Sequence, residues 1–257
     1  MGIGYIFGCL VSILLWKFDR QHYFLEVNKV ISKFLKNKIL IHVFYILFIF
    51  IISYLFSLMN HRELSNFLTA FIVIDISNTE RENLIKRAKV HFYDSISTIS
   101  RALVCGFVAP LFFILCFGNM FGILYMLIYN INLSIDDSPV FKSIYYALSI
   151  IPCVITEIPL FIIYTGRNKK LAVKYKGDYL INSILRPILN VDILAAYIES
   201  VNFNYYYSNK GVDYLKNYGD YKNNIDEKSI KDYLSVAYGI CLVAFIVFFI
   251  IIFRTAK

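Results

Sequence analysis

The chain has 257 residues, of which 58% are hydrophobic and 18% aromatic, and its formal net charge is +8. Soluble domains are about half apolar, so this composition excludes an ordinary soluble protein and indicates an integral membrane protein in contact with the lipid bilayer. The basic excess fits membrane orientation and contact with anionic lipids. Outside the apolar stretches no basic cluster is interleaved with aromatic residues, so no nucleic-acid partner is expected.

Five apolar segments are expected to form membrane spans, because a helix needs about 20 apolar residues to cross the hydrocarbon. The first is short and marginal, and the polar segments 60–101 and 165–235 lie between later spans. The sequence therefore predicts a single membrane domain of the all-α class, a multi-pass α-helical protein with amphipathic helices between its spans. The five segments are 2–17, 39–59, 103–135, 143–164 and 236–253.

Three segments between the spans carry weaker signals. Residues 17–38 are basic with apolar residues at helical spacing, which predicts an amphipathic helix on a membrane surface. Residues 67–76 are apolar but too short to cross, so they are expected to pack against the membrane domain. Residues 202–224 are rich in Tyr, Asn and Lys and are expected to form a loop.

The longest apolar stretch has no charge between Arg101 and Asp136. Within it Pro110 lacks an N–H and predicts a helix kink, and Gly106, Gly118 and Gly122 offer places for close helix contact. The alternative is a plain lipid anchor with incidental glycines. Whether residues 103–135 cross once or fold back is open at this point.

Few residues suggest a chemical site. The five cysteines all lie in apolar segments without a C-x-x-C pair, and the four histidines show no zinc spacing. We therefore expect no metal and no cofactor. Glu157, between Pro152 and Pro159 in an apolar segment, is a candidate intramembrane acid. It is either part of a site or helix–helix lock, or a carboxyl hydrogen-bonded to a neighbouring hydroxyl or backbone group.

One motif resembles a known superfamily. The run Gly106-Phe-Val-Ala109-Pro110-Leu111-Phe112-Phe, followed by Gly118, Gly122, Tyr125 and, downstream, Pro152, resembles the CobD/CbiB/AmpE superfamily. The likeness extends in order over most of the chain. It includes Leu10-Val-Ser-Ile-Leu-Leu, Gln21-His22-Tyr23, Glu80-Arg-Glu-Asn-Leu, Tyr218-Gly-Asp220 and Ile230-Lys-Asp near the closing span.

The departures from the motif distinguish the two branches of this superfamily. The cobalamin branch carries Ala-Glu-Asn-x-x-Asp-Gly, where this chain has Ser100, Arg101, Ala102 and Cys105 before Gly106. That branch also has Asn-Thr-Leu-Asp-Ser-Met where residues 129–134 stand, and two aspartates where Tyr145 and Tyr146 stand. Val154 replaces an arginine of the family. The resemblance thus implies that the carboxylates that would hold Mg²⁺ and phosphate oxygens are absent here.

The resemblance to the AmpE branch implies a non-catalytic signalling or regulatory protein of the bacterial inner membrane. That role is linked to cell-wall turnover and β-lactamase induction, with partners among membrane or cell-wall-pathway proteins. The alternative is a divergent adenosylcobinamide-phosphate synthase, which joins an aminopropanol unit to adenosylcobyric acid. It would need Asp136, Asp137 and Glu157 to rebuild the site. A transporter or channel component is disfavoured, because one intramembrane acid and no inverted repeat are visible.

Overall fold

The computed structural model describes residues 2–15, 20–35, 38–58, 62–75, 92–134, 138–209, 212–220 and 227–255. The regular secondary structure of this part of the chain is helical apart from one β-hairpin, and a π-helical turn, Val104–Val108, joins α6 to α7. The elements are α1 (Ile3–Leu14), α2 (Arg20–Phe34), α3 (Lys38–Ser57), α4 (Arg62–Val73), α6 (Phe92–Leu103), α7 (Ala109–Phe117), α8 (Asn119–Ser134), α9 (Pro139–Asn168), α10 (Tyr179–Leu185), α11 (Pro187–Ile198), β1 (Asn202–Asn209), β2 (Val212–Gly219) and α12 (Glu227–Thr255).

Within these ranges, four helical stretches are long and apolar enough to cross a membrane: Ile39–Phe56, Ile96–Phe117, Pro139–Asn168 and Lys228–Arg254. The stretches in α3 and α12 leave most of their apolar side chains at the surface of the protein. Such surfaces are stable only in contact with lipid. The chain is therefore an all-α, multi-pass integral membrane protein, as its composition predicts.

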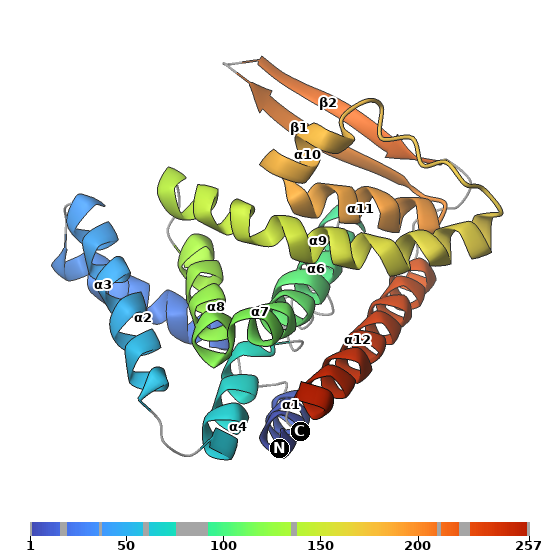
Figure 1. Ribbon diagram of the computed structural model, residues 1–257. Coiled ribbons are helices and arrows are strands. Elements are labelled where there is room, and N and C mark those ends of the chain that lie inside the picture. The colour runs from blue at the N-terminus through green and yellow to red at the C-terminus, as the bar shows by residue number, and fades with distance from the viewer. Residues whose placement is uncertain are drawn as a thin grey trace.

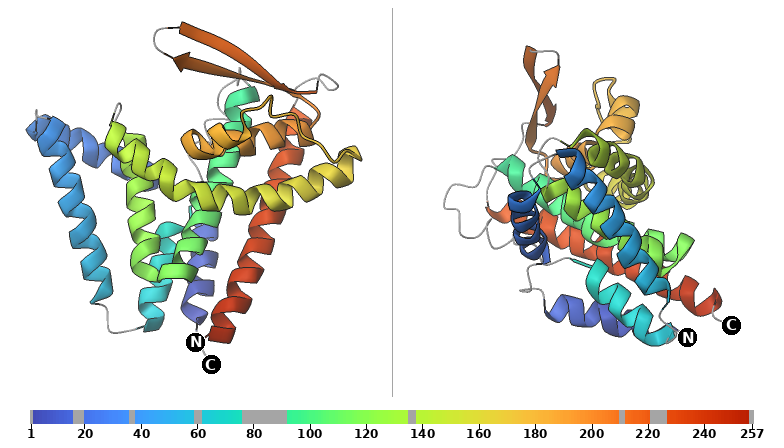
Figure 2. Two further views of the ribbon diagram at one scale, coloured as in Figure 1. Left: turned by 45° about the horizontal axis from the view of Figure 1, so that its top comes forward. Right: turned by 90° about the vertical axis from the view of Figure 1, so that its left-hand side faces the viewer.

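Helix α9 has a different direction from the other long helices. In Figure 1 and in the left view of Figure 2, α3, α8 and α12 run from one end of the molecule toward the other, whereas α9 lies across one end. Helices α10 and α11 and the hairpin lie beyond α9, and both chain ends lie at the opposite end. The length of α9 satisfies the requirement for a span, but its direction is crosswise to α3 and α12.

The apolar stretch 103–135 folds back on itself and is not one straight span. Helix α7 ends at Gly118, whose φ of 86° is strained for residues with a Cβ, and α8 begins at the next residue and packs along α7. A Cβ at Gly122 would lie 2.6 Å from a side-chain carbon of Ile114. The two glycines therefore permit the reversal and the close packing that follows it.

Gly106 and Pro110 form a joint with the segment that follows α4. Because Pro110 has no N–H, the carbonyl of Gly106 loses its normal helical partner. Nearby, the N–H of Ala109 donates to the carbonyl of Val104, five residues earlier, in a π-helical turn. The backbone N–H of Asp75 donates to the Gly106 carbonyl at 2.9 Å. A Cβ at Gly106 would lie 2.1 Å from the Asp75 carbonyl oxygen. Pro110 therefore leaves the Gly106 carbonyl available as an acceptor. The missing side chain of Gly106 gives the backbone around Asp75 room to reach that carbonyl.

Helices α1 and α4 pack as a close pair. The glycines Gly4 and Gly8, one turn apart, let α1 approach the backbone of α4, since a Cβ at either would lie within 2.4 Å of an α4 carbonyl oxygen. The Glu63 carboxylate accepts from the N–H groups of Gly2 and Gly4 at 2.9 and 2.8 Å and so caps α1. The helix has 12 residues, fewer than the about 20 needed to cross alone. The described part of the segment 2–17, which was predicted to be a span, thus forms the short helix α1, which packs as a pair with α4.

The segment expected to be a loop at 202–224 contains an antiparallel β-hairpin, and that expectation was wrong. Strands β1 and β2 pair from Asn202↔Gly219 to Asn209↔Val212. Phe203 and Tyr207 of β1 are buried, whereas Tyr206 is exposed, which is the two-residue alternation of a strand. The contacts of both strands with α11 cover the buried face.

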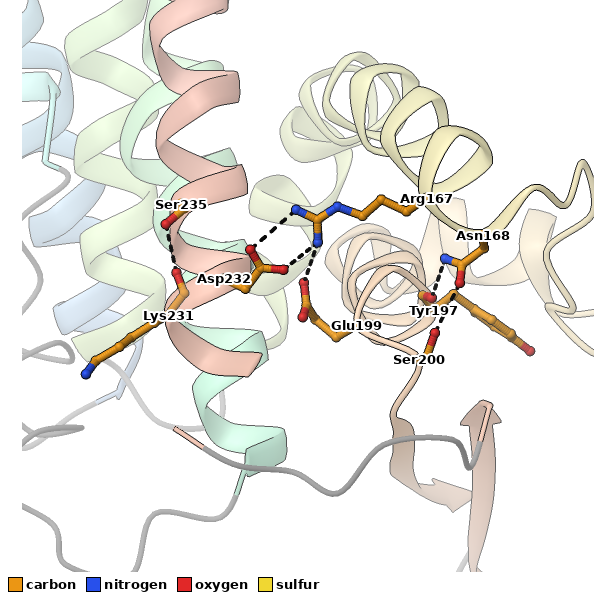
Figure 3. A network of polar contacts seen from close by, with 8 residues as sticks. All are labelled: Arg167, Asn168, Tyr197, Glu199, Ser200, Lys231, Asp232 and Ser235. Carbon is orange, nitrogen blue, oxygen red and sulfur yellow. Dashed lines mark hydrogen bonds and ion pairs between the residues drawn. The ribbon is translucent and has the colours of Figure 1, made fainter. Parts of the chain in front are cut away.

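A polar network fastens the far end of α9 to α11 and α12 (Figure 3). The Arg167 guanidinium donates to both carboxylate oxygens of Asp232, at 2.6 and 3.4 Å, and to Glu199 at 3.3 Å. Beside it, Asn168 donates to the carbonyl of Tyr197 and accepts from Ser200, both at 3.1 Å. One arginine thus joins the last turn of α9 to the end of α11 and the start of α12.

Substituting Gly106→Ala is expected to destabilise the protein by about 1–3 kcal/mol, because the new methyl group would press on the Asp75 backbone. Thermal unfolding of the detergent-solubilised protein measures this. Gly239→Ala is the matched control: it lies in α12 with open space around its Cβ position, and it should be neutral or stabilising by up to about 1 kcal/mol. Equal effects of the two substitutions would contradict the joint.

A second prediction concerns Glu199, which lies outside the candidate spans. Burial, reinforced by Asp232 and opposed by Arg167, raises the pKa of Glu199 to about 7. A pKa raised in the folded state contributes stability that is complete below the unfolded pKa near 4.5 and is lost as the pH rises through about 7. Relative to Glu199→Gln, the wild-type protein should therefore lose on the order of 2–3 kcal/mol of unfolding free energy between pH 5 and pH 8.

The comparison is made by unfolding both proteins in detergent at several pH values. Glu26→Gln, which removes an exposed carboxylate paired with Lys29 on α2, is the control and should follow the wild-type pH dependence. Parallel curves for wild type and Glu199→Gln would mean that Glu199 is ionised across this range.

Candidate functional site

A large cavity lies where α9 crosses α6 and α8, beneath α11 and β1. Its volume is about 580 Å³. Its lining comes from five elements and two connecting segments, which are distant in sequence. The lining residues are Ser97, Arg101, Asn132, Leu133, Ser138, Pro139, Lys142, Tyr145, Tyr146, Arg186, Ile188, Leu189, Asp192 and Tyr205. We call it the basic cavity.

Three cations and one carboxylate line the described part of the basic cavity: Arg101, Lys142, Arg186 and Asp192. The Arg186 guanidinium lies 4.7 Å from the centroid of the Tyr207 ring, and the Lys142 ammonium 5.9 Å from that of Tyr146. These cation–π contacts hold both charges without neutralising them. A cleft lined mainly by one sign of charge concentrates ligands of the opposite sign.

Asp192 is the buried acid of this cavity and is only 3% exposed. Burial raises its pKa to about 7, although hydrogen bonds from Ser100 and Ser97 and the charge of Arg101 act in the other direction. Its Oδ1 atom has no hydrogen-bond partner among the described residues. A buried oxygen without a partner is costly, and Asp192 is the one acid among the described lining residues.

Two further contacts shape the walls of the basic cavity. The Tyr145 hydroxyl lies 3.1 Å from the Cys105 sulfur, which ties α9 to the π-helical turn. The hydroxyl of Ser138, which caps the start of α9, lies 2.7 Å from Nε2 of His42 on α3. His42 thus lies next to the lining residue Ser138.

The residues of the motif that resembles the superfamily lie around the cavity and are not among its described lining residues. Gly106, Ala109, Pro110 and Leu111 are buried in the π-helical turn and the start of α7, and Phe112 is half-buried. Gly118 makes the turn between α7 and α8. Tyr125 of α8 is buried and stacks on Phe113 with ring centroids 5.0 Å apart, and Pro152 is buried within α9. Their role in function stays a prediction.

Glu157, the candidate intramembrane acid, lies in the second half of α9. Its carboxylate accepts a hydrogen bond from the Tyr179 hydroxyl at 2.8 Å, so it faces α10 in a second, smaller cavity. The other two acids proposed for a rebuilt synthase site, Asp136 and Asp137, lie outside the described residues.

Sequence reasoning missed most of the basic cavity. Arg186 and Asp192 were not singled out, although Asp192 is an acid inside the apolar run 187–198. The same signal drew attention to Glu157. Lys142 and Ser138 carry no sequence pattern that marks them as lining residues. Arg101, Tyr145, Tyr146 and the segment 129–134, which contains Asn132, stand out in the sequence as departures from the motif that the chain resembles.

A comparison with protein-family models, curated proteins and solved structures finds no match to this chain. The chemistry of the basic cavity, together with the resemblance in the motif, is therefore the basis for a proposed function.

Proposed function

We propose that the chain is a non-catalytic signalling or regulatory protein of the bacterial inner membrane, similar in role to the AmpE branch, which binds a small anionic ligand in the basic cavity. The role in cell-wall turnover and β-lactamase induction follows from the resemblance. The ligand class follows from the three cations that line the cavity.

One observation carries this proposal. The resemblance places acids of the cobalamin branch at the positions of Arg101, Cys105, Asn132, Tyr145 and Tyr146. Four of these five residues line the basic cavity, and the fifth, Cys105, contacts the hydroxyl of Tyr145 at 3.1 Å. Most of the positions that hold acids in the cobalamin branch thus lie around one cavity in this chain. This supports a site at the same place as in that branch, with different chemistry.

The changed residues favour an anion over a divalent cation. Mg²⁺ prefers several oxygen ligands, usually carboxylates together with water and phosphate. The described lining offers it one carboxylate, Asp192, beside three cations that repel it. Arginine binds carboxylate or phosphate through two parallel N–H donors. Arg101 and Arg186 therefore suit an anionic ligand, and Asp192 suits a donor group on the same ligand.

The same convergence of positions gives weight to the alternative, a divergent adenosylcobinamide-phosphate synthase. Such an enzyme would keep the site and hold Mg²⁺ and ATP with replacement acids. Glu157 does not line the basic cavity, so the replacement would have to come from Asp192 together with Asp136 and Asp137. The two functions differ in whether a covalent product is formed.

The regulatory role is tested in a bacterium whose β-lactamase is inducible and whose own AmpE has been deleted. The wild-type chain is expected to restore induction, and the double variant Arg101→Gln/Arg186→Gln to lower it by about tenfold or more, since each charged hydrogen bond contributes about 1.5–3 kcal/mol. The control is Arg62→Gln/Arg254→Gln, which removes two exposed arginines and should behave as wild type. Equal induction with and without the chain would reject the regulatory role.

The alternative is tested with the purified protein, adenosylcobyric acid, aminopropanol phosphate, Mg²⁺ and ATP, using mass spectrometry to detect the amide product. We expect none beside a working cobalamin-branch enzyme. Product that disappears in Asp192→Asn would establish the synthase and reject the non-catalytic role.

A further inference from the structure

The second cavity differs from the basic cavity in size, polarity and the charge of its lining. Its volume is about 410 Å³, and it lies on the other half of α9, facing the segment 169–178, α10 and α11. The lining is apolar and aromatic apart from one carboxylate and two tyrosine hydroxyls. The lining residues are Val154, Glu157, Ile158, Phe161, Ile162, Tyr175, Tyr179 and Leu194.

Glu157 is the acid of this cavity and is 7% exposed. It accepts the hydroxyl hydrogen of Tyr179 at 2.8 Å, and the ring of Tyr179 stands edge-on to that of Tyr175 with centroids 4.9 Å apart. No cation is among the described lining residues. Removing the partner of a buried charged group is strongly destabilising, and the partner of Glu157 among these lining residues is a neutral hydroxyl.

This combination of groups selects a cation. An ammonium group is attracted to a carboxylate and to the faces of aromatic rings, and clusters of such rings recognise quaternary ammonium ligands. Glu157, Phe161, Tyr175 and Tyr179 provide both kinds of group in one cavity. An anionic head would be repelled by Glu157, whereas the basic cavity would repel an ammonium.

The surroundings favour an ammonium group carried by a lipid. Ile158 and Ile162 line the cavity and are also 58% and 64% exposed on α9, so an acyl chain leaving the cavity meets an apolar helix face. The segment that supplies Tyr175 has exposed lysines on both sides of it, Lys174 and Lys176. Basic residues beside a lipid site attract phosphate groups.

We propose that the Glu157 cavity binds the headgroup of an amine phospholipid, with the ammonium group against Glu157 and the aromatic rings and the acyl chains along α9. The site is independent of the regulatory function proposed above. It gives the crosswise helix a specific lipid contact at the end of the molecule where α10 and α11 pack on it.

The test uses native mass spectrometry of the full chain released from detergent in the presence of phosphatidylethanolamine or phosphatidylglycerol with identical acyl chains. These lipids share a phosphate and differ in the ammonium group. Wild type is expected to retain phosphatidylethanolamine about tenfold more often than phosphatidylglycerol, and Glu157→Gln to retain the two equally. Glu26→Gln, which removes an exposed acid on α2, should keep the wild-type preference.

Phe161→Leu provides a second variant that keeps an apolar side chain but removes a ring face, and it should lower the preference severalfold even if Glu157→Gln does not fold. Free ethanolamine distinguishes the source of the ammonium group. If it binds at Glu157 while neither lipid is preferred, the site takes a soluble amine and the lipid proposal fails. A lipid preference that survives both substitutions would also overturn it.

Discussion

The arrangement of the membrane domain depends on one backbone hydrogen bond, from the N–H of Asp75 to the carbonyl of Gly106. Pro110 makes this bond available, because its missing N–H leaves that carbonyl without an intrahelical partner. The π-helical turn absorbs the mismatch while keeping α6 and α7 continuous. An unsatisfied backbone group costs several kcal/mol in a lipid environment, so the bond fixes where the α1–α4 pair joins the core.

From that joint the rest of the packing follows in order. Helix α7 turns back at Gly118, and Asn119, the first residue of α8, donates to Asn66 of α4 and accepts from Tyr5 of α1. The α1–α4 pair thus holds the α7–α8 turn as well as the Gly106 carbonyl. Helix α9 then crosses α8 and α6, and Arg167 secures its far end to α12.

Two cavities with opposite preferences lie along the crosswise helix α9. Its first half contributes Lys142 and two tyrosines to a cavity that favours anions, and its second half contributes Glu157 to one that favours an ammonium group. Both cavities hold a nearly buried carboxyl group. Asp192 is balanced by nearby arginine charge, whereas Glu157 has a tyrosine hydroxyl. The neighbours of each acid, and not the acid alone, determine which ligand charge it accepts.

Composition and apolar segment lengths were sufficient to establish an all-α membrane protein, because the cost of exposing apolar side chains and backbone to the wrong solvent leaves few other folds. The sequence also marked Gly106 and Pro110, since their backbone chemistry is local. It could not show that the Gly106 carbonyl accepts from Asp75, that 103–135 folds back, or that Arg101 and Asp192 share a cavity. Those features depend on contacts between segments far apart in the chain, and only the packed tertiary structure brings such groups together.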